Sequence, residues 1–354
     1  LRARCGSGVI KSTSLNADAG ALRRIVGNII CWFDSGTSAA PVNQVASAEK
    51  SATEWEKVDW ARILPFIIMH LVCLTVIWVG WSPVAVITAV ALYVLRMFGI
   101  TPFYHRYFSH RSFKTSRVGQ FIFGVLGASA VQRGPVWWAA HHRHHHAHSD
   151  KPADVHSPVQ HGFIRAHMGW FLSKKGFAPD LKRVRDLVNF PELRLLDRFD
   201  IIVPVLLALG VFFLGMALET WAPGLGTDRW QMLVWGFFVS TVLCSHGTYT
   251  INSLSHVFGK QRYKTGDSSR NNWFLALITL GEGWHNNHHH YQGSVKQGFR
   301  WYEIDISYYV LRAMTAVGLV WDLRVPSERA MAYEQALTPA VIERAAGHLA
   351  ASFS

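Results

Sequence analysis

Cysteine and acidic side chains are the scarce residues of this 354-residue sequence. Its four cysteines are widely separated and form no C-x-x-C pair, which argues against a disulfide framework and an iron–sulphur cluster. Asp and Glu number 23 against 35 Lys and Arg, so the formal net charge is +12. The basic residues are not gathered in one aromatic-rich domain, so no nucleic-acid partner is expected. An anionic membrane surface or a phosphate-bearing substrate suits this charge better.

Long apolar runs with few charges are abundant by contrast. Half of the residues are hydrophobic, and four runs are about as long as a transmembrane helix requires: 63–81, 83–103, 201–221 and 230–254. These runs predict an all-α integral membrane protein with four transmembrane helices. Arg96 lies inside the second run, where a charged side chain is expected to face protein or to reach toward an interface.

The basic residues also predict the orientation in the membrane. Eight of the 35 precede residue 63, 15 lie in residues 99–198, and 10 follow residue 254. Positively charged loops stay on the cytoplasmic side, so both termini and the loop after the second run are expected there. We divide the chain into a mostly disordered cytoplasmic leader (1–55), a membrane domain (56–326) and a cytoplasmic helical tail (327–354). Weaker apolar stretches at 118–131, 272–280 and 304–320 predict shorter, interfacial or half-buried helices.

Histidine is concentrated at three places that this topology brings to the cytoplasmic face. The densest is HHRHHHAH at residues 141–148, where six of eight positions are His. His105 and His110 precede it, and H-N-N-H-H-H follows the fourth run at residues 285–290. Neutral imidazole is the commonest protein ligand of iron, zinc and copper. The sequence therefore predicts a metal site in a cytoplasmic helical cap.

The spacing of the histidines makes this prediction more specific. On a helix, the pattern H-x-x-H-H keeps three imidazoles within an arc of about 100° and aims them at one point. The last group fits this pattern in one register, as His285, His288 and His289. The densest group fits it twice, as His142/His145/His146 or as His141/His144/His145, and periodicity leaves both open. His105 and His110 lie on different sides of a straight helix, so they serve two metals or straddle a helix end.

The number and kind of ligands indicate which metal is bound. Eight imidazoles exceed one octahedral shell, which favours two ions. Structural zinc sites hold four ligands that usually include Cys, whereas an all-nitrogen set suits a redox pair, with iron the natural choice for oxygen chemistry. Asp150, Asp154 and Glu282 are carboxylates that could orient ligand imidazoles through hydrogen bonds, and each could equally be a solvated surface charge.

At these motifs the sequence resembles the membrane fatty-acid desaturases, specifically the stearoyl-CoA (delta-9) desaturase branch in a bacterial form. The resemblance runs from about Trp60 to Arg324 and rests on GITPFYHRYFSH, WWAAHHRHHH, NSLSH and GEGWHNNHH in that order. It implies the register that starts at His142, because the family has Arg after the first His of this box. It further implies His256 as an extra ligand and Asn252 as a residue that holds a metal through water. The implied ligands of two Fe2+ ions are His105, His110, His142, His145, His146, His256, His285, His288 and His289.

The resemblance also implies an activity and a substrate tunnel. The expected reaction removes two hydrogens from adjacent methylenes with O2 and leaves a cis double bond, at delta-9 of a saturated acyl-CoA, in unsaturated fatty acid biosynthesis. Such unactivated C–H bonds require cofactor chemistry, so the protein's part is to position the chain in a bent, dry tunnel. Gln132, Trp138 and Thr248 resemble the bend of this tunnel, although Trp138 also suits an interfacial belt. Tyr93 and Met97 lie toward its closed end, and Met97 is expected to limit chain length.

Two departures from the branch leave the acyl carrier open. Ala140 and His141 stand where relatives have an Arg-Asp pair that touches the CoA headgroup, and Arg133 replaces an Asn. Acyl-CoA is the first expectation and a phospholipid-bound acyl chain the alternative. A basic cluster suits CoA phosphates and anionic lipid equally: Lys174, Lys175, Lys182, Arg183 and Arg185.

The two electrons that each turnover needs are expected from a separate donor, either a ferredoxin-type reductase or a b-type cytochrome with its NAD(P)H reductase. The chain has no Cys cluster, no evident nucleotide fingerprint and no added haem domain, and together with the His-rich box this favours a bacterial inner membrane. A di-iron alkyl or lipid hydroxylase is the close rival. A non-catalytic membrane metal-binding protein is the remote one, since it requires ligands near the midplane, where the runs offer only His70 and His246.

Overall fold

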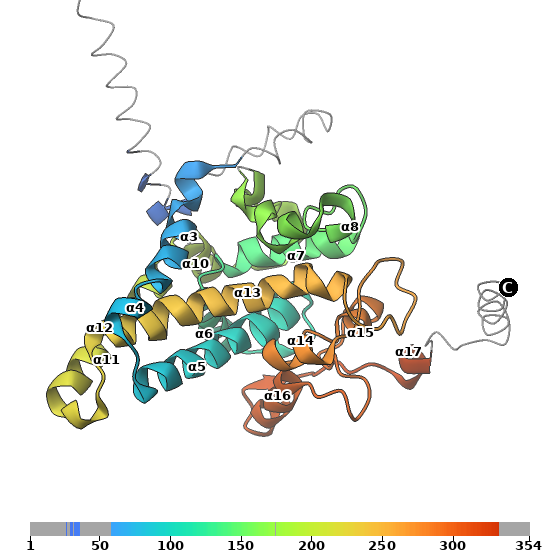
Figure 1. Ribbon diagram of the computed structural model, residues 1–354. Helices are drawn as coiled ribbons and strands as arrows, with labels where there is room; N and C mark the ends of the chain where they lie inside the picture. Colours follow the sequence, from blue (N-terminus) through green and yellow to red (C-terminus); the bar gives the residue numbers. More distant parts are fainter. Residues whose placement is uncertain (1–25, 27–28, 31, 36–57, 174, 333–354) are drawn as a thin grey trace, which may run out of the picture.

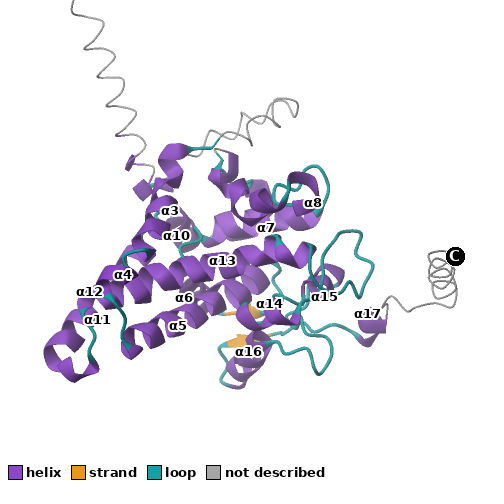
Figure 2. Ribbon diagram, in the orientation of Figure 1, coloured by secondary structure: helices purple, strands orange, loops and turns teal. Residues whose placement is uncertain are grey.

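Helices make up nearly all the regular structure in the computed structural model, which describes residues 26, 29–30, 32–35, 58–173 and 175–332 (Figures 1 and 2). The strands found within these ranges are β1 (Lys114–Thr115) and β2 (Val320–Trp321), which pair antiparallel. The predicted all-α class is therefore right for the body of the protein, with one short two-stranded exception.

The first two apolar runs form a helical hairpin. The first run is broken into α3 (Trp60–Cys73) and α4 (Val76–Val79) by a turn between them. The second is α5 (Pro83–Phe98), which continues without a break into the π-helix η4 (Gly99–Ser109). Ser82 caps α5, because its side chain accepts a hydrogen bond from the Ala85 N–H at 3.2 Å and Pro83 occupies the first turn.

The third and fourth runs form a second hairpin. The third is α11 (Ile202–Trp221), and the fourth is composed of α12 (Arg229–Gln231), η10 (Met232–Val239) and α13 (Ser240–Asn252). η10 packs against α3, α5 and α11 at the centre of the bundle. Gly236 permits this approach, since a Cβ there would lie 2.8 Å from Val211 Cγ1.

The prediction of four transmembrane helices is only partly supported. Among the described residues, two helices are long and apolar enough to cross a membrane, Pro83–Ser109 and Ile202–Trp221. The apolar helix at Ile63–Val79 is shorter, and the fourth run becomes more polar along α13. Four spans therefore remain a prediction.

Arg96 faces protein, as expected for a charged residue in an apolar run. It is fully buried, and its Nε donates to the Leu92 carbonyl at 3.1 Å. Its two terminal nitrogens donate to the hydroxyls of Thr241 and Ser240 on α13. The guanidinium therefore ties α5 to α13 through hydrogen bonds that would be costly to leave unmade in this setting.

A helical cap adjoins one end of the two hairpins, where the loops gather around α14 to α17 in Figure 2. Its longest helix is α7 (Pro135–His148), which packs against η4. The three weaker apolar stretches appear as α6 (Arg117–Ala128), α14 (Trp273–Ile278) and α16 (Ile306–Ala316). The remaining short helices are α8 (Pro158–His161), η5 (Arg165–Gly169), η6 (Trp170–Leu172), η7 (Lys175–Phe177), η8 (Leu181–Val184), α9 (Arg185–Val188), α10 (Pro191–Arg198), η9 (Pro223–Leu225), η11 (Leu254–His256), α15 (His285–His290) and α17 (Glu328–Ala332).

The ends of the chain fall largely outside the described residues. This includes most of the predicted leader and all of the predicted tail after Ala332. Lys174 of the basic cluster, in the middle of the chain, also lies outside the described residues. The described part of the leader contacts the body, because Asp34 pairs with Arg198 at 2.7 Å and the Ser35 hydroxyl donates to Asp200 at 3.3 Å.

Candidate metal centre and substrate cavity

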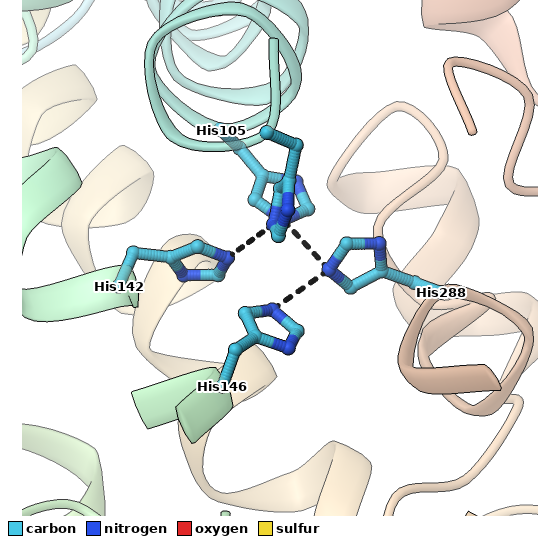
Figure 3. A group of neighbouring side chains, drawn as sticks. His105, His142, His146 and His288 are labelled. Carbon is cyan, nitrogen blue, oxygen red and sulfur yellow. Dashed lines mark hydrogen bonds between the residues drawn. The ribbon is translucent and has the colours of Figure 1, made fainter. Parts of the chain in front are cut away.

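Five histidines from three parts of the chain converge in a first group: His105, His110, His142, His146 and His288. Their candidate ligand nitrogens all lie within 4.8 Å of one another. The Nε2 atoms of His105 and His288 are 3.0 Å apart, and those of His146 and His288 are 2.9 Å apart (Figure 3). Those of His110 and His142 are 2.8 Å apart. Two nitrogens bound at right angles to one ion, with bonds of about 2.1 Å, lie about 3 Å apart. This spacing suits a single ion.

The π-helix η4 explains why His105 and His110 belong to one group. The His110 N–H donates to the His105 carbonyl at 3.2 Å, which is the i to i+5 bond of a π-helix. Pro102 lies inside η4 and has no N–H for an α-helical bond. The wider turn brings residues five apart to nearby sides of the helix. The expectation that these two histidines serve different metals is therefore wrong, while His110 does sit at the helix end.

Four buried histidines form a second group next to the first: His145, His256, His285 and His289. The Nε2 atoms of His256 and His285 are 3.1 Å apart. His256 is carried by η11, the short turn of helix directly after α13. His145 and His146 have ring centroids 5.4 Å apart, so neighbouring residues of α7 supply the two groups.

The two H-x-x-H-H motifs each divide their ligands between the groups. On α7, His142 and His146 enter the first group and His145 the second. On α15, His285 and His289 enter the second group and His288 the first. Residues i and i+4 are about 40° apart around a helix, whereas i+3 and i+4 are about 100° apart. The expectation that each motif aims three imidazoles at one point is therefore wrong.

The structure distinguishes the two registers that periodicity left open. His142, His145 and His146 lie in the groups, whereas His141 and His144 belong to neither group among the described residues. The nine histidines named from the resemblance are the members of the two groups. Asn252 ends α13 and lines the neighbouring cavity.

Burial keeps most of these imidazoles neutral, which is the form that binds metal. Desolvation, followed by the charges of neighbouring histidines, holds the pKa of His142, His146, His285 and His288 well below the usual value. The pKa of His289 falls to about 4 for the same main reason. Burial would also lower the pKa of His145, but the Asp154 carboxylate raises it above the usual value. A divalent ion is the partner that the neutral imidazoles accept.

Each of the three carboxylates predicted to orient ligands lies against a ligand imidazole. Asp154 Oδ2 is 2.9 Å from His145 Nδ1, Glu282 Oε2 is 2.5 Å from His105 Nδ1, and Asp150 Oδ2 is 3.4 Å from His256 Nδ1. Burial alone would raise the pKa of Asp154 and Asp150, but the adjacent imidazoles hold both pKa values below the usual range. Charged carboxylates in these positions fix the ring orientation and the tautomer that leaves Nε2 free.

Asp267 is a fourth such carboxylate that the sequence did not reveal. Its Oδ2 lies 2.6 Å from His289 Nδ1. It is placed by the irregular loop between η11 and α14, where no periodic pattern marks a residue as facing the site. The Nε2 atom of His289 is buried and has no hydrogen-bond partner among the described residues, as expected of an atom that binds a metal.

A buried network of ion pairs holds Glu282, the carboxylate that contacts His105 of the first group, in place. Arg106 Nε donates to Glu282 Oε1 at 3.1 Å, and Arg106 Nη1 donates to Asp305 at 2.9 Å. Asp305 in turn caps α16 by accepting from the Tyr308 N–H at 3.1 Å. Ligand position is therefore coupled to the packing of the cap.

A cavity of about 270 Å³ lies beside the histidine groups. Its wall includes His142 of the first group and Gln132, Trp138 and Thr248, three of the predicted tunnel residues. Gln132 Nε2 donates to Thr248 Oγ1 at 3.0 Å, and the Trp138 ring stacks on His142 with centroids 5.0 Å apart. Val131 and Arg133 on either side of Gln132 have φ of 62° and 70°. Such left-handed conformations of non-glycine residues cost about 1–3 kcal/mol each and cluster at functional sites.

Tyr93 and Met97 lie behind this wall and are not among the described residues that line the cavity. Met97 is buried, with its Sδ 4.0 Å from Thr248 Oγ1, and the Tyr93 hydroxyl donates to the Ile278 carbonyl at 2.7 Å. Both pack against Gly247, where a Cβ would meet Tyr93 Oη at 2.8 Å and Met97 Cε at 2.9 Å. Their role at a closed end remains a prediction.

The surplus histidines have various environments. His70, His246 and His167 form a chain of hydrogen bonds of 3.0 and 2.9 Å across α3, α13 and η5. His148 Nδ1 donates to the His144 carbonyl at 2.9 Å. His141 is buried among aromatic rings, and desolvation lowers its pKa to about 3.

Comparison with known proteins decides the family. The sequence model for "Fatty acid desaturase" matches residues 50–321. The chain belongs to the fatty acid desaturase family. The histidine groups of this desaturase are compatible with the di-iron centre typical of the family. Its lipid-metabolic class is thereby fixed, while its substrate is not.

The curated relatives of this desaturase differ in acyl carrier and in position of attack. A "Palmitoyl-monogalactosyldiacylglycerol delta-7 desaturase, chloroplastic" of Arabidopsis thaliana is 35% identical over 78% of this chain and 71% of its own length. An "Acyl-CoA 5-desaturase" of Anemone leveillei is 34% identical over 82% of this chain and 88% of its own length. An "sn-1 stearoyl-lipid 9-desaturase" of Synechocystis sp. is 35% identical over 77% of this chain and 82% of its own length.

Proposed function

We propose that this desaturase uses O2 to introduce a cis double bond at delta-9 of a saturated acyl chain, with acyl-CoA as the carrier. The observation that carries the proposal is that the first of two adjacent all-histidine groups contributes His142 to the wall of a cavity. The balance is one saturated –CH2–CH2– unit, O2, two electrons and two protons, which give –CH=CH– and two water molecules. When bound, two Fe2+ ions supply the oxidising chemistry that this unactivated bond requires.

The chain's own residues position the reactants. Nine imidazoles hold the ions, and the carboxylates of Glu282, Asp154, Asp150 and Asp267 fix four of these rings. The apolar, aromatic wall excludes water from the acyl chain, and the Gln132–Thr248 hydrogen bond fixes the wall near His142. Regioselectivity follows from which methylene this shape holds nearest to the first group.

An acyl-lipid desaturase is the second candidate. The observation in its favour is that two of the relatives described above act on lipid-linked chains by name. In addition, Arg133 on the cavity wall is paired with Asp200 at 2.7 Å, so its charge is compensated within the protein.

The same proposal includes four transmembrane helices, a site and both termini on the cytoplasmic side, and residence in a bacterial inner membrane. The concentration of Lys and Arg before residue 63, in residues 99–198 and after residue 254 supports this orientation. A separate donor, a ferredoxin-type reductase or a b-type cytochrome with an NAD(P)H reductase, supplies the electrons. A basic face of the cap suits an acidic donor.

Expression in a desaturase-deficient host tests the function. Double bonds are located by mass spectrometry in CoA, phospholipid and glycolipid fractions, with the His142→Ala variant as the inactive control. We expect delta-9 alkenes with the wild type only. An alcohol in their place identifies the rival hydroxylase, and unchanged fatty acids beside a competent donor contradict the proposal.

A further inference from the structure

Most polar groups on the cavity wall are paired with one another. Gln132 donates a hydrogen bond to Thr248, and Arg133 forms an ion pair with Asp200. The Nε2 atom of His141 and the Nε1 atom of Trp170 differ, because each is buried and has no hydrogen-bond partner among the described residues. His156 also lines the cavity, but its Nδ1 lies 3.5 Å from the Asp154 carboxylate. Of His141 and Trp170, His141 directly precedes His142 of the first group in α7, so its ring lies on the part of the wall next to the candidate metal ligands.

The surroundings of His141 are aromatic. Its ring centroid lies 4.5 Å from that of Trp137 and 5.3 Å from that of Trp170, and its side chain is only 8% exposed. Within the described residues, no carboxylate lies within 4.0 Å of it. A buried nitrogen without a partner destabilises a protein, so a side chain of this kind on a cavity wall is a candidate for contact with a bound ligand.

A saturated acyl chain offers very few such atoms. Its methylenes neither donate nor accept hydrogen bonds, and the polar atoms lie at the carboxyl end, in the ester or thioester that joins it to its carrier. We propose that His141 is a substrate-binding residue whose Nε2–H donates a hydrogen bond to the carbonyl oxygen at the carboxyl end of the acyl chain. This inference rests on the proposed function, since it assigns the acyl substrate of that reaction to this cavity.

This hydrogen bond sets the direction in which the acyl chain lies in the cavity. The carbonyl is held among Trp137, Trp170 and His141, and the saturated tail is left to the apolar part of the wall. A fixed carboxyl end also fixes how many methylenes separate it from the first histidine group. His141 thereby contributes to regioselectivity without touching the metal ions. An oxyester lipid and a CoA thioester share this carbonyl, so the two carriers are separate arms of the test.

The experiment removes the carbonyl group from the ligand and, separately, the imidazole of His141 from the protein. Purified enzyme, reconstituted with iron in vesicles and supplied with a donor, is given stearoyl glycerolipid in one arm and stearoyl-CoA in the other. KM is measured for whichever carrier is desaturated. Ki is measured for an analogue in which CH2 replaces the carbonyl. In the wild type we expect the analogue to bind about tenfold more weakly than the substrate, the value of one hydrogen bond in a dry site.

Three variants separate binding from folding. In His141→Phe the preference for the carbonyl compound should vanish, with KM raised and kcat less affected. His141→Gln retains an N–H donor and should keep most of the preference. His148→Phe removes another histidine of α7 that does not line the cavity, and should behave as the wild type. Iron content and melting temperature are compared for all three, so that a misfolded variant is recognised.

The results divide cleanly. The inference is overturned if the wild type and His141→Phe prefer the carbonyl compound over the analogue by the same factor. It is also overturned if His148→Phe loses this preference. Should the wild type desaturate neither carrier, the proposed function fails. Equilibrium dialysis of the same ester and analogue against wild type and His141→Phe then decides the binding role without turnover.

Discussion

Glu282→Gln tests whether each carboxylate that contacts a ligand histidine controls the metal affinity of that histidine's group alone. Glu282 accepts from His105 Nδ1 at 2.5 Å and from Arg106 Nε at 3.1 Å, and all three side chains are nearly fully buried. Gln preserves the size of the side chain but removes its negative charge. His105 then loses the partner that increases the electron density at its Nε2, and its ring is less firmly oriented.

The expected loss of metal affinity can be estimated from similar carboxylate–histidine contacts. Outer-sphere partners of this kind change metal affinity by about 10- to 100-fold, which corresponds to about 1.4–2.7 kcal/mol. The loss should be confined to the first group, because Glu282 contacts His105 and none of the four histidines of the second group in the described contacts. In a buffer that holds free Fe2+ near the wild-type half-saturation point, we expect the iron content to fall from about two toward about one ion per chain.

Two matched variants complete the assay. Asp267→Asn removes the carboxylate at His289 and should weaken the second group instead. Glu192→Gln makes the same chemical change at an exposed pair with Arg117, and should leave iron content unaltered. Iron per chain is measured by mass spectrometry after equilibration. The reasoning is refuted if Glu282→Gln binds two ions at the same free-iron concentration as the wild type.

Three further predictions concern stability and specificity. Met97→Ala opens space behind Thr248 and should shift products from C16 toward C18 chains, and an unchanged C16/C18 ratio by gas chromatography would contradict the role of Met97. Burial raises the pKa of Asp197 to about 6, against the opposing hydrogen bond from the Trp137 N–H. Because the folded pKa lies above the unfolded value of about 3.9, this group destabilises the protein as pH rises from 4 through 6. Asp197→Asn should therefore raise the melting temperature at pH 7 but hardly at pH 4, and equal shifts at both would falsify the assignment. Removal of metal with a chelator should lower the melting temperature in proportion to the ions lost, since ligands that bind only the folded state stabilise it, and calorimetry of apo and reloaded protein checks this.

The sequence predicted the helical elements and the identity of the clustered histidines better than it predicted their grouping. Apolar runs and His spacing are local properties, so α5, α7, α11 and α15 follow from them. The division of each H-x-x-H-H motif between two groups depends on how α7 and α15 face each other, which no local pattern contains.

Other features escaped the sequence for similar reasons. The π-helix that unites His105 and His110 differs from an α-helix only in its backbone hydrogen bonds, and Asp267 reaches His289 from an irregular loop. The buried Nε2 atom of His141, which has no hydrogen-bond partner among the described residues, depends on tertiary packing that the sequence pattern does not contain.

The four carboxylates behind the histidines have an electrostatic consequence for the centre as a whole. Every ligand in the two groups is an imidazole, so the ligands themselves contribute no negative charge. Asp150, Asp154, Asp267 and Glu282 contribute four, and the Arg106–Asp305 pair adds none. Two divalent ions, as in the proposed di-iron centre, would carry four positive charges and make the assembly electrically neutral. Two trivalent ions would leave two charges uncompensated in a buried region, which is energetically costly. The four carboxylates would therefore favour the reduced form of the ions over the oxidised form.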